Sequence, residues 1–132
     1  MVIDTSAILA LLYREEDAEQ IARCLEGARS RLISAVTRIE LSFVVEGRKG
    51  EAGRADLEEL LKIVDPDIVA VTAQHADFAI EAFRSFGKGR HRAGLNIGDC
   101  FSYALARAAN QPLLFKGDDF SRTDIEIALL TP

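Results

Sequence analysis

Short apolar segments alternate with longer amphipathic segments along the whole chain. The apolar segments are rich in Val, Ile and Leu, which is typical of buried strands. They cover residues 2–3, 32–34, 68–71 and 112–115, with a last one at 125–130. We therefore predict four strands and a fifth near the end of the chain.

The amphipathic segments repeat their apolar positions with the spacing of an α-helix. This pattern predicts helices over residues 7–12, 17–25, 36–47, 55–63 and 73–86, and a further helix that starts at Asp99. Residues 48–53 carry charges and glycines, so a turn is expected there. A loop is expected at residues 87–92.

Strands that alternate with helices are typical of a parallel sheet covered on both faces. The chain has 132 residues, of which 48% are hydrophobic, enough for one proper core. We predict a single domain over residues 1–132, an α/β fold that forms a three-layer α/β/α sandwich with a central parallel sheet of four to five short strands. Such sheets place their functional sites beyond the carboxyl ends of the strands.

Acidic residues fall at that edge of the predicted sheet. Asp4 follows the first strand, Glu40 lies early in the helix after the second, Asp99 starts the helix before the fourth, and Asp118 and Asp119 follow the fourth. Topology therefore allows all of them to lie along one rim.

Each acid also has a purely local explanation. Capping boxes could form at two places, from Thr37 with Glu40 and from Asn96 with Asp99. Asp4 could cap the first helix, and the acids after the fourth strand could be turn residues. Taken singly, these explanations are at least as good as a functional role.

Taken together, several carboxylates at one edge repel one another and raise each other's pKa unless a cation lies among them. Hard oxygen ligands without His or Cys suit Mg²⁺ or Mn²⁺. Such an ion can lower the pKa of a bound water and stabilise charge on a phosphate. No Ser or Cys nucleophile motif and no phosphate-binding glycine loop occurs in the sequence, so we expect attack by water.

A run of cations precedes the helix of Asp99. No acid occurs between Glu81 and Asp99, whereas Arg84, Lys88, Arg90, His91 and Arg92 lie there. The formal net charge of −5 argues against general binding to nucleic acid, so any contact with phosphates would be local. The alternative is a solvated loop.

The residues that carry these features resemble the PIN-domain ribonucleases, and among them the toxins of VapBC toxin–antitoxin modules. The resemblance rests on residues 2–7, on Glu40, on 89–100 and on 114–125, and it covers essentially the whole chain. It implies a magnesium- or manganese-dependent endoribonuclease that cuts single-stranded or structured RNA, often tRNA or rRNA. By this resemblance Asp4 and Asp99 match the principal metal ligands and Glu40 the third acid.

The resemblance also implies further site residues and partners. The fourth acid falls on Asp118 or Asp119, with a slight preference for Asp119, and Thr5 or Ser6 supplies a hydroxyl that orders the site. The expected partners are RNA, a cognate VapB-type antitoxin and a second copy of the chain, in a homodimer and a heterotetramer or larger assembly with the antitoxin.

A rival hypothesis is a catalytically silent binding module. Its carboxylates would only receive a basic antitoxin segment in a DNA-bound repressor complex. In either case we expect a cytoplasmic protein, because no basic leader precedes Val2 and the apolar run at 7–13 is too short to span a bilayer.

Overall fold

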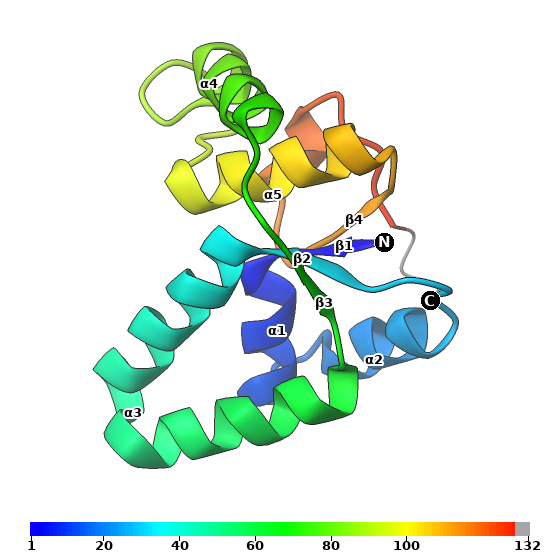
Figure 1. Cartoon of the computed structure of the whole chain (residues 1–132), viewed down its shortest axis with the longest axis vertical. Helices are drawn as coiled ribbons and strands as arrows, with labels where there is room; N and C mark the ends of the chain where they lie inside the picture. Colours follow the sequence, from blue (N-terminus) through cyan, green and yellow to red (C-terminus); the bar gives the residue numbers. More distant parts are fainter. Residues whose placement is uncertain (129–132) are drawn as a thin grey trace.

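The computed structural model describes residues 1–128 and places a four-stranded sheet between two layers of helices (Figure 1). The strands are β1 (Val2–Ile3), β2 (Leu32–Ser34), β3 (Asp67–Val69) and β4 (Leu113–Leu114). The helices are α1 (Thr5–Leu12), α2 (Ala18–Glu26), α3 (Ala35–Val64), α4 (Ala73–Phe86) and α5 (Ile97–Ala109), followed by the 3₁₀ helix η1 (Phe120–Arg122). The strand order is β3-β2-β1-β4, and every pairing is parallel.

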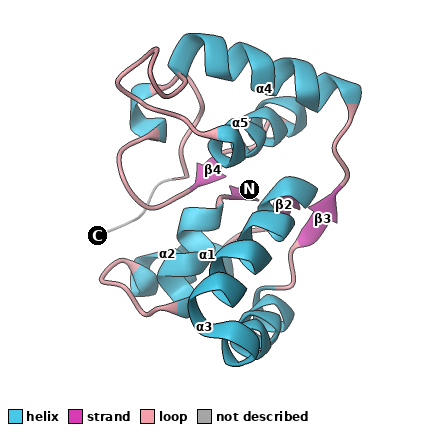
Figure 2. Ribbon diagram, turned by 90° about the vertical axis from the view of Figure 1, so that its left-hand side faces the viewer, coloured by secondary structure: helices cyan, strands magenta, loops and turns pink. Residues whose placement is uncertain are grey.

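Each strand sends successive side chains to opposite faces, and this alternation creates two separate cores. Val2 and Leu113 pack with α4 and α5 in one core. Ile3 and Leu114 pack with α1, α2 and α3 in the other. Figure 2 shows the two helical layers on either side of the sheet. The prediction of a three-layer α/β/α sandwich is confirmed, with four strands.

The predicted turn over residues 48–53 is confirmed as a sharp bend at a single residue. The segment α3 runs from Ala35 to Val64 as two helical arms that meet at Gly50, whose φ of 59° and ψ of −143° are not helical. The glycine absorbs the whole change of direction, because this backbone conformation is open only to a residue without Cβ. Gly53 lies close to the first arm, since an added Cβ would be 2.9 Å from the Val45 carbonyl oxygen. The two arms of α3 therefore meet at a tight corner.

The predicted fifth strand is wrong for the part of it that the structure describes. Only one bridge joins Ile127 to Leu113, with hydrogen bonds of 2.9 Å on each side. The pairing is short because β4 itself ends at Leu114, after which Phe115 packs against Phe120 with ring centroids 5.1 Å apart. Residues 129–130 of the prediction lie outside the described residues.

The remaining boundaries follow the hydrophobic pattern closely. The helix predicted over 73–86 has these bounds, and β3 covers 67–69 where the pattern predicts 68–71. Among residues 1–128, no helix combines the length and apolar character that crossing a bilayer requires.

Candidate active site

Asp4 directly follows β1, at the carboxyl end of the sheet, and its carboxylate is held from three sides. The residue is only 3% exposed. Its Oδ2 accepts hydrogen bonds from the backbone N–H and the hydroxyl of Ser6, at 3.0 and 2.7 Å. Its Oδ1 accepts a hydrogen bond from the hydroxyl of Ser102 in α5, at 2.6 Å. Asp4 is thus the N-cap of α1, as the local explanation predicts, but two hydroxyls beyond the cap also fix its orientation.

Glu40 lies in α3 and reaches the start of two other helices. Its carboxylate accepts a hydrogen bond from the hydroxyl of Thr5 in α1. It also lies against Gly98 in α5, where an added Cβ would be 2.6 Å from Oε1 of Glu40. Only glycine leaves room for the carboxylate there, so Glu40 is brought next to Asp99.

The capping box proposed for Thr37 and Glu40 does not exist. The N-cap of α3 is Ser34, whose Oγ accepts a hydrogen bond from the backbone N–H of Val36 at 3.1 Å. Thr37 instead lies inside the protein, fully buried, with its Oγ1 3.4 Å from Oγ of Ser102. Glu40 is therefore free of any capping role and is available to the site.

Asp99 forms a true capping box and faces the other acids as well. Its Oδ2 accepts from the backbone N–H of Asn96 at 3.0 Å, and Oδ1 of Asn96 accepts from the backbone N–H of Asp99 at 2.9 Å. Burial, and to a lesser degree the negative charges of Asp4, Asp119 and Glu40, together raise the pKa of Asp99 to about 7, while the hydrogen bond from Asn96 opposes the shift. Four acids from distant parts of the chain therefore share one electrostatic field.

The two acids after β4 face different surroundings. Asp119 is exposed and adds to the shift of the Asp99 pKa, whereas Asp118 lines a hollow of about 440 Å³ together with Glu16 and Asp17. Their loop is tied to the site because the backbone N–H of Lys116 donates to Oγ of Ser6 at 3.0 Å. The geometry therefore associates Asp119 with the acidic site.

Both predicted site-ordering hydroxyls are used, each by a different acid. Thr5 donates to Glu40 and Ser6 donates to Asp4. The sequence leaves the choice between them open, but the helix turn at the end of β1 directs one hydroxyl to each carboxylate.

These acids suit a hydrated divalent ion. Within residues 1–128, no group of three or more Asp, Glu, His or Cys side chains lies close enough together to bind a metal ion by itself. Mg²⁺ and Mn²⁺ do not need one, because Mg²⁺ keeps several waters and takes only one or two carboxylates directly. The pKa of Asp99 is raised first by burial and then by the negative charges of its neighbours, and a cation would relieve this cost of ionisation. The donor set of hard oxygens therefore fits the ion.

The predicted RNA-binding cations lie in the loop between α4 and α5. Lys88, Arg90 and Arg92 are all exposed. The guanidinium of Arg90 lies over the ring of Phe83, 5.0 Å from its centroid, which stiffens a side chain that would otherwise move freely. This loop leads directly into the helix that starts with the capping box of Asp99.

His91 is turned into the same loop. Its Nδ1 accepts a hydrogen bond from the backbone N–H of Ala93 at 3.0 Å, and its ring packs edge-on against Phe86, with centroids 5.3 Å apart. His91 thus shapes the loop, while its three cationic neighbours remain on the surface.

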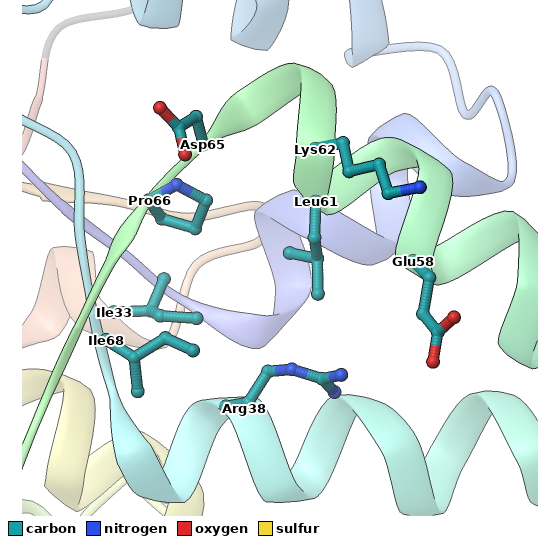
Figure 3. A pocket seen from close by; sticks show the side chains of 8 residues that line it. All are labelled: Ile33, Arg38, Glu58, Leu61, Lys62, Asp65, Pro66 and Ile68. Atoms are coloured by element: carbon teal, nitrogen blue, oxygen red, sulfur yellow. The ribbon is translucent and has the colours of Figure 1, made fainter.

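The acidic site is separate from a well-formed hollow elsewhere. Figure 3 shows this pocket of about 380 Å³, where Arg38 from the first arm of α3 faces Glu58 and Lys62 from the second. Ile33 and Ile68 form its apolar wall. Neither Asp4, Glu40, Asp99 nor Asp119 lines this pocket, so it is not part of the acidic site.

Two site residues were missed by the sequence prediction. Gly98 makes room for Glu40, and Ser102 donates to Asp4. A signal existed for Ser102, because it lies three residues after Asp99 and hence on a neighbouring part of the same helical face. For Gly98 the sequence holds no comparable signal, since the contact depends on the docking of α3.

Comparison with known proteins gives consistent results. The family model that describes the PIN domain matches residues 1–126. Ribonuclease VapC30 of Mycobacterium tuberculosis is 52% identical over 130 residues, which cover 98% of this chain and 99% of that protein. Ribonuclease VapC of Mycolicibacterium smegmatis is 50% identical over 125 residues, covering 95% and 97%.

Solved structures share the fold at low sequence identity. Mycobacterium tuberculosis VapC20, described as a sarcin-ricin loop cleaving toxin, superposes with a TM-score of 0.74 at 16% identity, covering 94% of this chain and 95% of that one. VapBC2 from Rickettsia felis, bound to a DNA fragment from its promoter, has a TM-score of 0.74 at 17% identity, covering 96% and 94%.

Proposed function

Because this chain belongs to the PIN domain family, we propose that it is the endoribonuclease toxin of a type II toxin–antitoxin module. Its relatives over almost the full chain are named ribonucleases. The single observation that carries the proposal is the convergence of Asp4, Glu40 and Asp99 at one edge of the sheet, where the hydroxyls of Ser6 and Thr5 and the space left by Gly98 hold them. The proposed substrate is single-stranded or structured RNA, such as tRNA or rRNA.

In the proposed mechanism, Asp4 and Asp99 would hold a Mg²⁺ or Mn²⁺ ion. When bound, the ion supplies Lewis-acid stabilisation of the phosphate and an acidified water. Glu40 and Asp119 orient the attacking water and accept its proton, because carboxylates are effective general bases within hydrogen-bonding reach. Thr5 holds Glu40 in place for this role through its hydroxyl.

The surface cations would bind the RNA backbone beside these acids. Lys88, Arg90 and Arg92 are exposed in the loop that leads into α5. On a protein with a formal net charge of −5, such a local group of cations attracts phosphate to its part of the surface. We therefore propose that RNA enters along the loop between α4 and α5.

Cleavage of RNA by the purified chain tests the proposal. In Mn²⁺, Asp99→Asn and Asp119→Asn should each lower the rate by about 10²-fold or more, as expected for loss of a ligand or general base. Asp118→Asn and the exposed helical control Asp77→Asn should stay within about twofold, like most changes away from the chemistry. Unchanged cleavage by Asp99→Asn would remove the mechanism.

A growth assay distinguishes the proposal from the silent binding module. Expression of the chain without its partner should arrest growth, and expression of Asp99→Asn should not. Equal growth in both cases, with binding of a partner intact, would favour the binding module.

We propose that the antitoxin partner docks on the first arm of α3. Ile39 and Phe43 lie one helical turn apart and are 52% and 76% exposed, beside Glu40 on the same helix. A segment anchored on them would reach the acids with a basic side chain. Phe43→Asp should then abolish capture by the antitoxin while leaving RNA cleavage unchanged.

The second copy of a homodimer would use a different apolar surface. A groove of about 460 Å³ runs between α4 and α5, where Ile80, Phe83 and Ile97 are exposed. Ile80→Asp should yield a monomer by light scattering and still bind the antitoxin, the reverse of Phe43→Asp. A variant that loses both properties would contradict the assignment of two surfaces.

A further inference from the structure

Two buried hydroxyls connect α3 to α5 directly beneath the acidic site. Thr37 and Ser102 are both completely buried. Their oxygens are 3.4 Å apart, and Oγ of Ser102 lies 2.6 Å from Oδ1 of Asp4. The proposed mechanism gives neither hydroxyl a role.

The number of hydrogens that each group can donate fixes the direction of these two hydrogen bonds. A serine hydroxyl has one hydrogen to donate, and an ionised carboxylate can only accept. The short contact with Asp4 takes the hydrogen of Ser102, so Ser102 faces Thr37 as an acceptor and Thr37 is the donor. The hydrogen bonds run from Thr37 through Ser102 to Asp4, and each bond polarises the next.

The same counting distinguishes the two oxygens of Asp4. A carboxylate offers about four acceptor positions, two on each oxygen. Oδ2 accepts two hydrogen bonds from Ser6, whereas Oδ1 accepts one from Ser102. Among the contacts of the described residues, Oδ1 alone keeps an open acceptor position.

We infer that Ser102 is a positioning residue, which holds the carboxylate of Asp4 at one rotation so that Oδ1 is the oxygen offered to the divalent ion. The inference rests on the proposed function, because the ion is part of it. It adds to that function the residue that orients Asp4, one of the proposed metal ligands. Ser102 itself touches neither ion nor substrate.

The affinity for Mn²⁺, measured by EPR titration of the purified protein without RNA, tests the inference. Ser102→Ala should weaken binding by about 10-fold or more, because groups that orient metal ligands typically contribute 10–100-fold to affinity. Thr37→Val is the matched control, since it removes the neighbouring buried hydroxyl but leaves the hydrogen of Ser102 on Asp4. Its affinity should stay within about threefold of the natural chain, although both variants lower the midpoint of urea unfolding.

If Ser102→Ala does not fold, Ser102→Cys takes its place in the test. A thiol is similar in size to the serine hydroxyl but is only a weak hydrogen-bond donor. Ser102→Cys should also bind Mn²⁺ about 10-fold more weakly. Wild-type affinity in the folded Ala or Cys variant would overturn the inference, as would an equal loss in Thr37→Val.

Kinetics add a readout that simple destabilisation would not move. Raising Mn²⁺ should restore the kcat of Ser102→Ala toward that of the natural chain, with KM for RNA unchanged throughout. If the natural chain binds no Mn²⁺ and cuts no RNA, the proposed function itself has failed. If it binds and cuts, and Ser102→Ala behaves identically, only the role of Ser102 is refuted.

Discussion

Replacing Asp99 by asparagine should stabilise the metal-free protein, although it removes a residue of the proposed active site. Burial and the charges of Asp4, Asp119 and Glu40 raise the pKa of Asp99 to about 7, from an ordinary value of 3.8. Above the unfolded-state pKa, the unfolded chain ionises this group freely while the folded chain resists ionisation. The free energy of unfolding therefore falls as the pH rises from about 4 to about 7, and it stays lowered at higher pH.

The expected gain in the free energy of unfolding follows from the shift in the pKa of Asp99. Three pKa units correspond to about 4 kcal/mol if the whole shift acts on stability. Water reaches the half-buried carboxylate and screens part of this, so we expect about 1–2 kcal/mol for Asp99→Asn at pH 8. The amide can still accept the hydrogen bond from Asn96, so the capping box loses little. At pH 4.5 the two proteins should be nearly equal in stability.

Urea unfolding followed by circular dichroism, in EDTA at pH 4.5 and pH 8, measures both values. Asp77→Asn, an exposed acid in α4, is the control and should show no difference that grows with pH. Adding Mn²⁺ at about 100 times its Kd should stabilise the natural chain by about 2.7 kcal/mol and reverse the order of the two proteins. The reasoning is refuted if Asp99→Asn is no more stable than the natural chain at pH 8 in EDTA.

Three further substitutions test other contacts. Gly98→Ala should lower RNA cleavage at least about 10-fold with only a small loss of stability, because the new Cβ displaces the flexible carboxylate of Glu40 from its place; cleavage assays and urea melts measure both. Gly50→Ala should cost about 1–3 kcal/mol because its φ is +59°, whereas Gly47→Ala, in open helix, should be neutral or stabilising in the same melts. Thr5→Val should reduce kcat with little change in KM, since the lost hydroxyl positions Glu40; unchanged kcat would contradict that role.

Hydrophobic periodicity predicts most of the fold because local burial decides it. The alternation of apolar strands with amphipathic helices is present in the sequence, and the layers follow from it. The change of direction in α3 is predictable from the charged and glycine-bearing residues, but its restriction to one residue is not. Gly50 bends the chain at one residue, and the close approach at Gly53 depends on packing between the two arms.

The site is predictable to the level of topology and no further. The carboxyl ends of parallel strands bring Asp4 and Asp99 to one edge wherever such a fold forms. Which side chain contacts each acid depends on docking between helices, so the sequence can place Ser102 near Asp99 on one helical face but does not show that it donates to Asp4. Whether Asp118 or Asp119 lies nearer to Asp99 likewise depends on how the loop after β4 turns.

The division of the interior into two cores has a consequence for when the protein becomes dangerous to its host. Asp4, Thr5 and Glu40 belong to the layer of α1 and α3, whereas Asp99 and Ser102 belong to α5 on the far side of the sheet. A nascent chain that has assembled only the layer of α1 and α3 lacks the carboxylate of Asp99 and the hydroxyl that Ser102 donates to Asp4. Toxicity should therefore emerge in a single step, at the final docking of α5.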